Sequence, residues 1–166
     1  MNACARQFQQ DNFVTEVERI LQQFDIRAGP LRLELTESMV LDNLASSVET
    51  MIHLREPDVR LSLDDFGTGN ASLSCLTQLP LSEIKNDRSF VQNVTSDRSH
   101  AIFTRSIIDI GRNFGIEVVT DGIENGNLRN FLLENGCPLR QGYLFSQRVA
   151  IKEFELLLGK CSIETL

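Results

Sequence analysis

Two adjacent carboxylates, Asp64 and Asp65, are the first residues of the chain whose types and spacing could do chemistry. They end an alternating apolar and polar run that begins at Val59, and the segment Phe66-Gly67-Thr68-Gly69 follows them. Two carboxylates this close repel each other unless a cation or a proton lies between them. Taken alone, the pair favours a strand end whose aspartate caps the next helix. Its interpretation therefore depends on the other polar residues of the chain.

Further polar side chains follow other short apolar runs in the same way. If these runs are parallel strands of a barrel, their carboxyl ends lie at one rim, where barrel enzymes place their chemistry. The candidate residues at these ends are Glu34, Asp64, Asp65, Lys85, Asp87, Asp121 and Gln141.

This candidate set predicts a site for divalent metal ions. Carboxylate and amide oxygens, without histidine or thiolate, suit hard ions such as Mg²⁺ or Mn²⁺. Asp64 is the best candidate to bridge two ions. The ammonium of Lys85 could hold an attacking water or a phosphate oxygen, and the amide of Gln141 could orient the water or a base edge. Phosphodiester hydrolysis is the reaction class that this set favours.

Hydrophobic periodicity predicts the elements that position these residues. Strands are expected at 31–36, 59–64, 81–87, 116–121 and 139–141, and helices at 12–24, 44–52, 71–79, 98–113, 127–135 and 151–158. Asn127 is the expected cap of its helix, and Gly115 and Gly159 are the expected ends of theirs. The alternation of strands and helices predicts a parallel sheet with crossover helices. An open doubly wound sheet and a closed barrel both satisfy this order. The polar face on every strand favours the barrel.

Composition narrows the class of protein. The chain has 166 residues, of which 42% are hydrophobic, and this predicts a single domain over 1–166. The net charge of −7 argues against binding to DNA, RNA or anionic membranes. No apolar run reaches membrane-spanning length, and the first residues lack the apolar core of a secretory signal. We expect a cytoplasmic protein.

Four motifs follow one another along the chain. They are Glu34-Leu35-Thr36-Glu37-Ser38, Asp64-Asp65-Phe66-Gly67-Thr68-Gly69, Ile84-Lys85-Asn86-Asp87-Arg88-Ser89-Phe90-Val91 and Gln141-Gly142-Tyr143-Leu144-Phe145-Ser146. In this order they resemble the motifs of the EAL-domain family of bacterial cyclic di-GMP phosphodiesterases. The first residues, from Met1 to Phe8, also resemble the Asn-x-Ser-Ala-Arg-Gln segment of the family. The resemblance covers nearly all of the chain, and the spacing and order of the motifs agree with it.

The resemblance implies roles for individual residues. Asn2, Glu34 and Asp64 would bind one Mg²⁺ or Mn²⁺ ion, and Asp64 and Asp65 would bind a second. Catalytic roles would fall to Lys85, Asp121 and Glu124, with Asp87 and Gln141 near the substrate. Support of the site and its loop would come from Glu37, Phe66, Gly67, Thr68 and Gly69.

The implied partners are cyclic di-GMP, a second copy of the chain in a homodimer, and an upstream sensory or GGDEF-type domain. The loop from Asp65 to Leu76 resembles the segment of the family that couples dimerisation to the active site.

The chain also departs from the family pattern. It contains no Glu-Ala-Leu tripeptide on a first strand, and a full barrel of this type takes about 200–250 residues. The expected fold is therefore an incomplete TIM-type (β/α) barrel that lacks its first strand-helix unit. Asp121 stands where the family has a glutamate, and a displacement of about 1 Å at such a position can slow a reaction on the order of a hundredfold.

These departures leave several functions open. The chain is either a cyclic di-GMP phosphodiesterase with weak or absent turnover, or a non-catalytic module that binds cyclic di-GMP or a protein partner. An acidic scaffold that binds no nucleotide is a third alternative.

Overall fold

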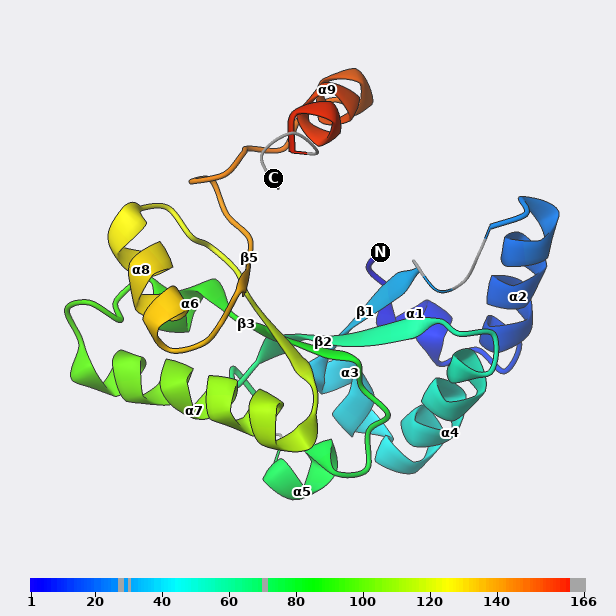
Figure 1. Cartoon of the computed structure of the whole chain (residues 1–166). Helices are drawn as coiled ribbons and strands as arrows, with labels where there is room; N and C mark the ends of the chain where they lie inside the picture. Colours follow the sequence, from blue (N-terminus) through cyan, green and yellow to red (C-terminus); the bar gives the residue numbers. More distant parts are fainter. Residues whose placement is uncertain (27–28, 30, 70–71, 162–166) are drawn as a thin grey trace.

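The computed structural model describes residues 1–26, 29, 31–69 and 72–161, with the backbone alone for 158–161. Its centre is a sheet of five parallel strands in the order β1-β2-β3-β4-β5 (Figure 1). The strands are β1 (Arg32–Thr36), β2 (Arg60–Phe66), β3 (Glu83–Asn86), β4 (Glu117–Thr120) and β5 (Leu139–Arg140). Neighbours in the sheet are neighbours in the sequence, as in one part of a (β/α) barrel. The predicted parallel sheet with crossover helices is confirmed.

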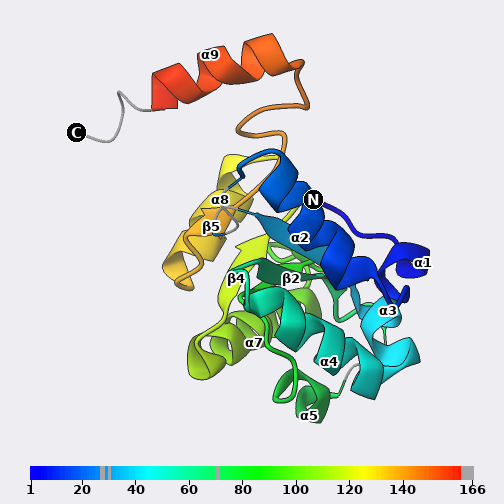
Figure 2. The same ribbon diagram turned by 90° about the vertical axis from the view of Figure 1, so that its right-hand side faces the viewer.

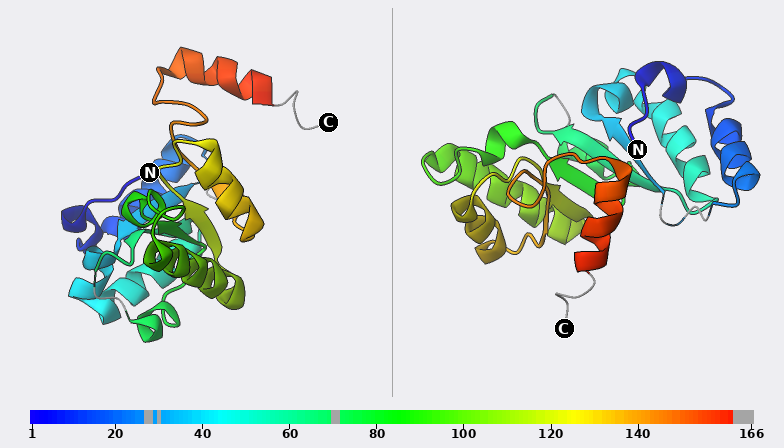
Figure 3. Two further views of the ribbon diagram at one scale, coloured as in Figure 1. Left: turned by 90° about the vertical axis from the view of Figure 1, so that its left-hand side faces the viewer. Right: turned by 90° about the horizontal axis from the view of Figure 1, so that it is seen from above.

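Helices connect the strands and cover the sheet. They are α1 (Ala5–Phe8), α2 (Phe13–Gln23), α3 (Glu37–Asp42), α4 (Leu44–Arg55), α5 (Leu73–Leu76), α6 (Arg88–Val91), α7 (Arg98–Phe114), α8 (Gly126–Glu134) and α9 (Ile151–Cys161). In Figure 1, α3, α4, α5 and α7 lie together on one face of the sheet, and Figures 2 and 3 show α9 projecting away from it. No helix in the described ranges combines the length and the apolar character that a membrane crossing needs.

The two faces of the sheet differ in polarity, and this difference sets the fold. Leu33, Leu35, Leu61, Leu63 and Ile84 are almost fully buried in the core. Side chains alternate across a strand, so the intervening residues of β1, β2 and β3 point to the opposite face, which carries charge. The predicted alternation of β1 is confirmed by its burial, in which Leu33 and Leu35 are buried and their neighbours are half-buried.

Helix α7 begins and ends close to its predicted bounds because a capping residue defines each end. The side chain of Asp97 accepts a hydrogen bond from the backbone N–H of Ser99 over 2.7 Å, and Gly115 ends the helix in the left-handed conformation at φ 68°. In the middle of the helix, a Cβ on Gly111 would lie 2.1 Å from a methyl carbon of Val118. A glycine at 111 therefore lets α7 pack directly on β4.

Several predicted boundaries were wrong. The side chain of Asn125, not that of Asn127, caps α8 by accepting from the N–H of Leu128 over 3.0 Å. Strand β2 continues past Asp64 to Phe66, with a register shift against β3 after Leu63.

Other ends were displaced by a few residues. Strand β3 stops before the predicted residue 87. Helix α5 covers only part of the predicted 71–79, of which residue 71 lies outside the described residues. Helix α9 continues through residue 159 to Cys161. The short helices α1, α3 and α6 had no predicted counterpart.

The N-terminal segment extends the sheet at its first edge. Asn2 forms an isolated parallel bridge with Glu34. The backbone N–H of Ala3 donates to the carbonyl of Glu34 over 3.0 Å, and the N–H of Glu34 donates to the carbonyl of Met1 over 2.8 Å. This pairing places Asn2 beside the middle of β1.

Candidate active site

Glu34, Asp64 and Lys85 converge on the polar face of the sheet, from three successive strands. The Nζ atom of Lys85 lies 3.0 Å from Oε2 of Glu34 and 3.2 Å from Oδ1 of Asp64. The Lys85 side chain is only 9% exposed. Burial alone would lower the pKa of Lys85, but the hydrogen bonds and charges of Glu34 and Asp64 outweigh it and raise that pKa. The ammonium is therefore a fixed cation between two carboxylates.

Asp65 adds a carboxylate that has a strained backbone conformation and several acidic neighbours. Its backbone lies in the left-handed region at φ 56°, which few residues other than glycine adopt, and its N–H donates to Oδ1 of Asp64 over 3.1 Å. Burial raises the pKa of Asp65 most, followed by repulsion from Asp64 and Asp87, with a smaller contribution from Asp121. Lys85 opposes these effects. Carboxylates from several strands thus lie within electrostatic reach of one another.

The loop after β2 is tied to Glu37 at the start of α3. Oε2 of Glu37, a side chain that is almost fully buried, accepts the N–H of Gly67 over 3.0 Å. A Cβ on Gly69 would lie 2.5 Å from Oε1 of the same carboxylate. The hydroxyl of Thr68 closes the turn by donating to the carbonyl of Asp65 over 2.8 Å. The Glu37 carboxylate and the Thr68 hydroxyl thus restrain the first residues of this loop.

Two further residues shape the same loop. Phe66 is buried, and Gly67 has φ 92° with the ring of Phe103 directly above it. A Cβ on Gly67 would lie 2.6 Å from the Phe103 ring. Glycine at 67 is therefore required both by the backbone conformation and by the close contact.

The remaining predicted residues lie farther along the rim. Asp87 caps α6 by accepting from the N–H of Ser89 over 2.9 Å. Asp121 follows β4 directly, and its carboxylate accepts the N–H of Gly122 over 2.6 Å. Glu124 pairs with Arg88 over 2.6 Å. Each of these acids therefore has a fixed local partner.

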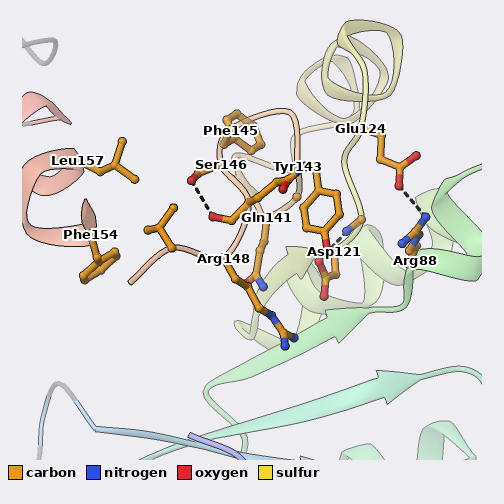
Figure 4. A pocket seen from close by; sticks show the side chains of 14 residues that line it. Arg88, Asp121, Glu124, Gln141, Tyr143, Phe145, Ser146, Arg148, Phe154 and Leu157 are labelled. Carbon is orange, nitrogen blue, oxygen red and sulfur yellow. Dashed lines mark hydrogen bonds and ion pairs between the residues drawn. The ribbon is translucent and has the colours of Figure 1, made fainter. Parts of the chain in front are cut away.

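A cavity of about 830 Å³ opens beside these residues. Asp121, Glu124 and Gln141 line it, and Figure 4 shows Phe154 and Leu157 of α9 on the side away from Arg88 and Glu124. Glu34, Asp64, Asp65 and Lys85 do not line it. The predicted residues thus fall into two groups, an acidic cluster on the sheet and the residues that line the cavity. Asp121 lines the cavity and also acts electrostatically on Asp65 of the acidic cluster.

Sequence reasoning missed two groups of residues. Arg88, Tyr143 and Arg148 line the cavity and had been given no site role. A second polar layer, made of Arg32, Ser62, Glu83 and Glu117, lies on the same face of the sheet as Glu34, Asp64 and Lys85. The signal for this layer was present in the alternation, because three of its members stand two positions before a residue of the acidic cluster.

The acidic cluster suits a hard cation by its chemistry. Within the described ranges, no three His, Cys, Asp or Glu side chains are grouped closely enough to hold a metal ion. The set expected for the first ion needs only two acids, Glu34 and Asp64, together with the amide of Asn2, which stands beside Glu34. The Lys85 ammonium between the two carboxylates shows that this place already accommodates positive charge. Oxygen donors of this kind fit Mg²⁺ or Mn²⁺.

The fold and the site together define a class: part of a parallel (β/α) barrel with an acidic cluster toward the carboxyl ends of its strands. Comparison with known proteins gives the family. The EAL domain family matches residues 1–148. This chain belongs to the EAL domain family.

The relatives agree with this assignment. The cyclic di-GMP phosphodiesterase NbdA of Pseudomonas aeruginosa is 37% identical over 158 residues, which are 95% of this chain and 20% of that protein. The signaling protein YkoW of Bacillus subtilis is 35% identical over 155 residues, or 93% of this chain and 19% of that protein. The chain therefore spans about a fifth of the length of these two curated relatives.

Solved structures of the family share the fold. The EAL enzyme Bd1971, in its form bound to cAMP and cyclic di-GMP, matches with a TM-score of 0.90 at 36% identity, over 94% of this chain and 42% of that chain. BlrP1 of Klebsiella pneumoniae, as a manganese and cyclic di-GMP complex, matches with a TM-score of 0.82 at 26% identity, over 89% of this chain and 38% of that chain. The expected TIM-type barrel fold is confirmed, and metal binding at this fold has a structural precedent.

Proposed function

We propose that this chain is a phosphodiesterase domain that binds cyclic di-GMP at the rim of the sheet and hydrolyses one of its phosphodiester bonds. The observation that carries the proposal is the convergence of Glu34 and Asp64 on Lys85, with Asp65 held beside them. Relatives that match nearly all of this chain are named as cyclic di-GMP phosphodiesterases, and a structural neighbour is described in complex with that dinucleotide.

Two divalent ions, Mg²⁺ or Mn²⁺, complete the proposed site. Asn2, Glu34 and Asp64 would hold the first, and Asp64 with Asp65 would hold the second. Such ions lower the pKa of a bound water and neutralise charge on the phosphate. The protein contributes a set of hard oxygen donors and fixes Asp64 and Asp65 in sequence on one strand.

Other residues act on the substrate and the water. The Lys85 ammonium, which Glu34 and Asp64 orient, would hold the attacking water or a phosphate oxygen by donating a proton in a hydrogen bond. Gln141, from the end of β5, would orient the water or a base edge through its amide. Asp121 and Glu124 would take part in catalysis and Asp87 would contact the dinucleotide; Asp87 and Asp121 both act electrostatically on Asp65.

Assembly and regulation are part of the proposal. The loop from Asp65 to Leu76 would couple a homodimer interface to the site, since its first residues carry Asp65 and its glycines rest on Glu37. Residues 70 and 71 of this loop lie outside the described residues. A sensory or GGDEF-type domain upstream in the parent protein would act through this interface.

A hydrolysis assay tests the proposal. The whole chain is incubated with cyclic di-GMP and Mn²⁺, and the linear dinucleotide is measured by chromatography, with binding measured in parallel by calorimetry. We expect turnover that Asp64→Asn abolishes. Asp109→Asn is the matched control, because Asp109 is an exposed acid on α7 that pairs with Arg112, and it should leave the rate unchanged.

The alternative functions predict distinct results in this assay. Binding of cyclic di-GMP without turnover would support a non-catalytic module. If the chain shows neither binding nor turnover, both of these functions are contradicted and an acidic scaffold is favoured.

A further inference from the structure

A layer of polar residues lies directly before the acidic cluster on the same face of the sheet. Arg32, Ser62 and Glu83 precede Glu34, Asp64 and Lys85, respectively, by two positions on β1, β2 and β3. Because side chains two apart on a strand share a face, each member of this positioning layer stands next to one member of the cluster.

Glu83 is the centre of the positioning layer. Its side chain is 3% exposed, and both carboxylate oxygens have partners. Oε2 accepts from Nη1 of Arg32, and Oε1 accepts the hydroxyl of Ser62 over 2.7 Å. A carboxylate buried to this degree stays charged only when it is paired and hydrogen-bonded, so these contacts determine where the side chain lies.

The contacts of Glu83 join strands that are not neighbours. Strands β1 and β3 each pair with β2 and do not pair with each other. The Arg32–Glu83 ion pair crosses β2 and links β1 to β3, just as the Lys85–Glu34 pair does one layer farther along. Backbone pairing with β2 does not by itself fix the distance between β1 and β3, because that distance also depends on how strongly the sheet curves. The Arg32–Glu83 contact restrains that distance.

We propose that Arg32, Ser62 and Glu83 are positioning residues, which set the placement of Lys85 relative to Glu34 and thereby determine both metal affinity and turnover. This inference rests on the proposed function. None of the three residues touches the reacting atoms in this proposal, and their effect passes through the strand spacing. Groups outside the first ligands commonly change metal affinity in this way.

Glu83→Gln is the sharpest perturbation, because it keeps the size of the side chain and a carbonyl acceptor for Ser62 while it removes the charge that holds Arg32. Glu117→Gln is the matched control. Glu117 is the other carboxylate partner of Arg32, at 3.1 Å from Nη2, but it is 48% exposed. Both variants lose one negative charge from the same face and one partner of the same arginine.

Two readouts on the whole chain separate positioning from stability. Calorimetric titration with Mn²⁺ alone reports affinity without turnover, and steady-state kinetics with cyclic di-GMP and Mn²⁺ report kcat and KM separately. Both are run at a temperature where circular dichroism shows each variant folded. We expect Glu83→Gln to weaken Mn²⁺ binding about tenfold. In the same variant, kcat should fall about 10- to 100-fold with KM changed less than about threefold, whereas Glu117→Gln should match the wild type.

The result that overturns the inference is a folded Glu83→Gln protein with the Mn²⁺ affinity and kcat of Glu117→Gln. If Glu83→Gln does not fold, Ser62→Ala takes its place, because it removes only the hydroxyl that fixes Oε1 of Glu83. Ser62→Ala should lower kcat and Mn²⁺ affinity about threefold, and wild-type values would contradict the inference. A wild-type chain without turnover would refute the proposed function, and the Mn²⁺ titration would still test the positioning layer.

Discussion

Asn86 is a residue whose replacement by an apolar side chain is expected to stabilise the protein. It is the last residue of β3 and is fully buried, with Phe66 and Thr120 as its partners in the register. Its side chain points to the helix-covered face, because Ile84, two positions earlier, belongs to the hydrophobic core. Among the described residues, neither Nδ2 nor Oδ1 has a hydrogen-bond partner. We therefore expect Asn86→Leu to stabilise the protein.

The magnitude follows from opposing contributions. A buried polar group without a partner costs about 1–3 kcal/mol. Replacing the amide of Asn86 by the apolar end of leucine removes this cost and adds apolar burial. Misfit of the branched side chain in a tight core opposes this gain and costs about 1–3 kcal/mol. The net expectation is a gain of about 1–2 kcal/mol in the free energy of unfolding, which corresponds to about 2–8 °C in Tm for a chain of this size.

Urea and thermal unfolding, followed by circular dichroism on the whole chain, measure this effect. Asn113→Leu is the control, since Asn113 is exposed on α7, and it should change the free energy of unfolding by less than about 0.5 kcal/mol. A lower free energy of unfolding for Asn86→Leu, at an unchanged m-value, would refute the reasoning. It would show that Asn86 makes favourable hydrogen bonds, for example to a buried water.

Two other substitutions have clear expected outcomes. Asp121→Glu restores the longer side chain of the family and should raise kcat about tenfold. Asp109→Glu, on the exposed face of α7, is the control. An unchanged kcat in the folded Asp121→Glu variant would count against a role for residue 121 in turnover. Gly67→Ala should lower the free energy of unfolding by about 1–3 kcal/mol, because φ is 92° and the new Cβ would meet the Phe103 ring. Thermal unfolding measures this against Gly126→Ala, whose Cβ would meet nothing within 4 Å, and equal Tm values for the two variants would contradict it.

Much of the sheet and the acidic cluster could be predicted because both depend on alternation. Period two places Glu34, Asp64 and Lys85 on the face opposite the buried leucines, and the parallel order brings them to one side of a single sheet. The structure confirms that these three residues meet. The short helices were missed for a related reason, since four to six residues are too few to show a helical period.

Residue type alone could not assign the helix cap or the end of β2. Asn125 and Asn127 both have a side chain suited to capping, and the choice depends on the extended backbone at Asn125, with φ −146° and ψ 164°. Asp65 was expected to follow the end of its strand, whereas it lies within β2 in a left-handed conformation. Nothing in its type predicts this conformation. The hydroxyl of Thr68 donates to the carbonyl of Asp65, and Glu37 accepts from the N–H of Gly67, so contacts of the following loop stabilise it.

The positioning layer shows why residue types and spacing stop short of the full site. From the sequence, Arg32 and Glu83 are two charged residues on two separate strands, and either could face water with a mobile counterion. They form an ion pair across β2, and Ser62 of that strand donates to the same Glu83 carboxylate. The pairing is thus a property of three strands together. Lys85 reaches Glu34 across the same strand, so the proposed active site and the half-buried ion pair beside it both depend on how β1, β2 and β3 are arranged.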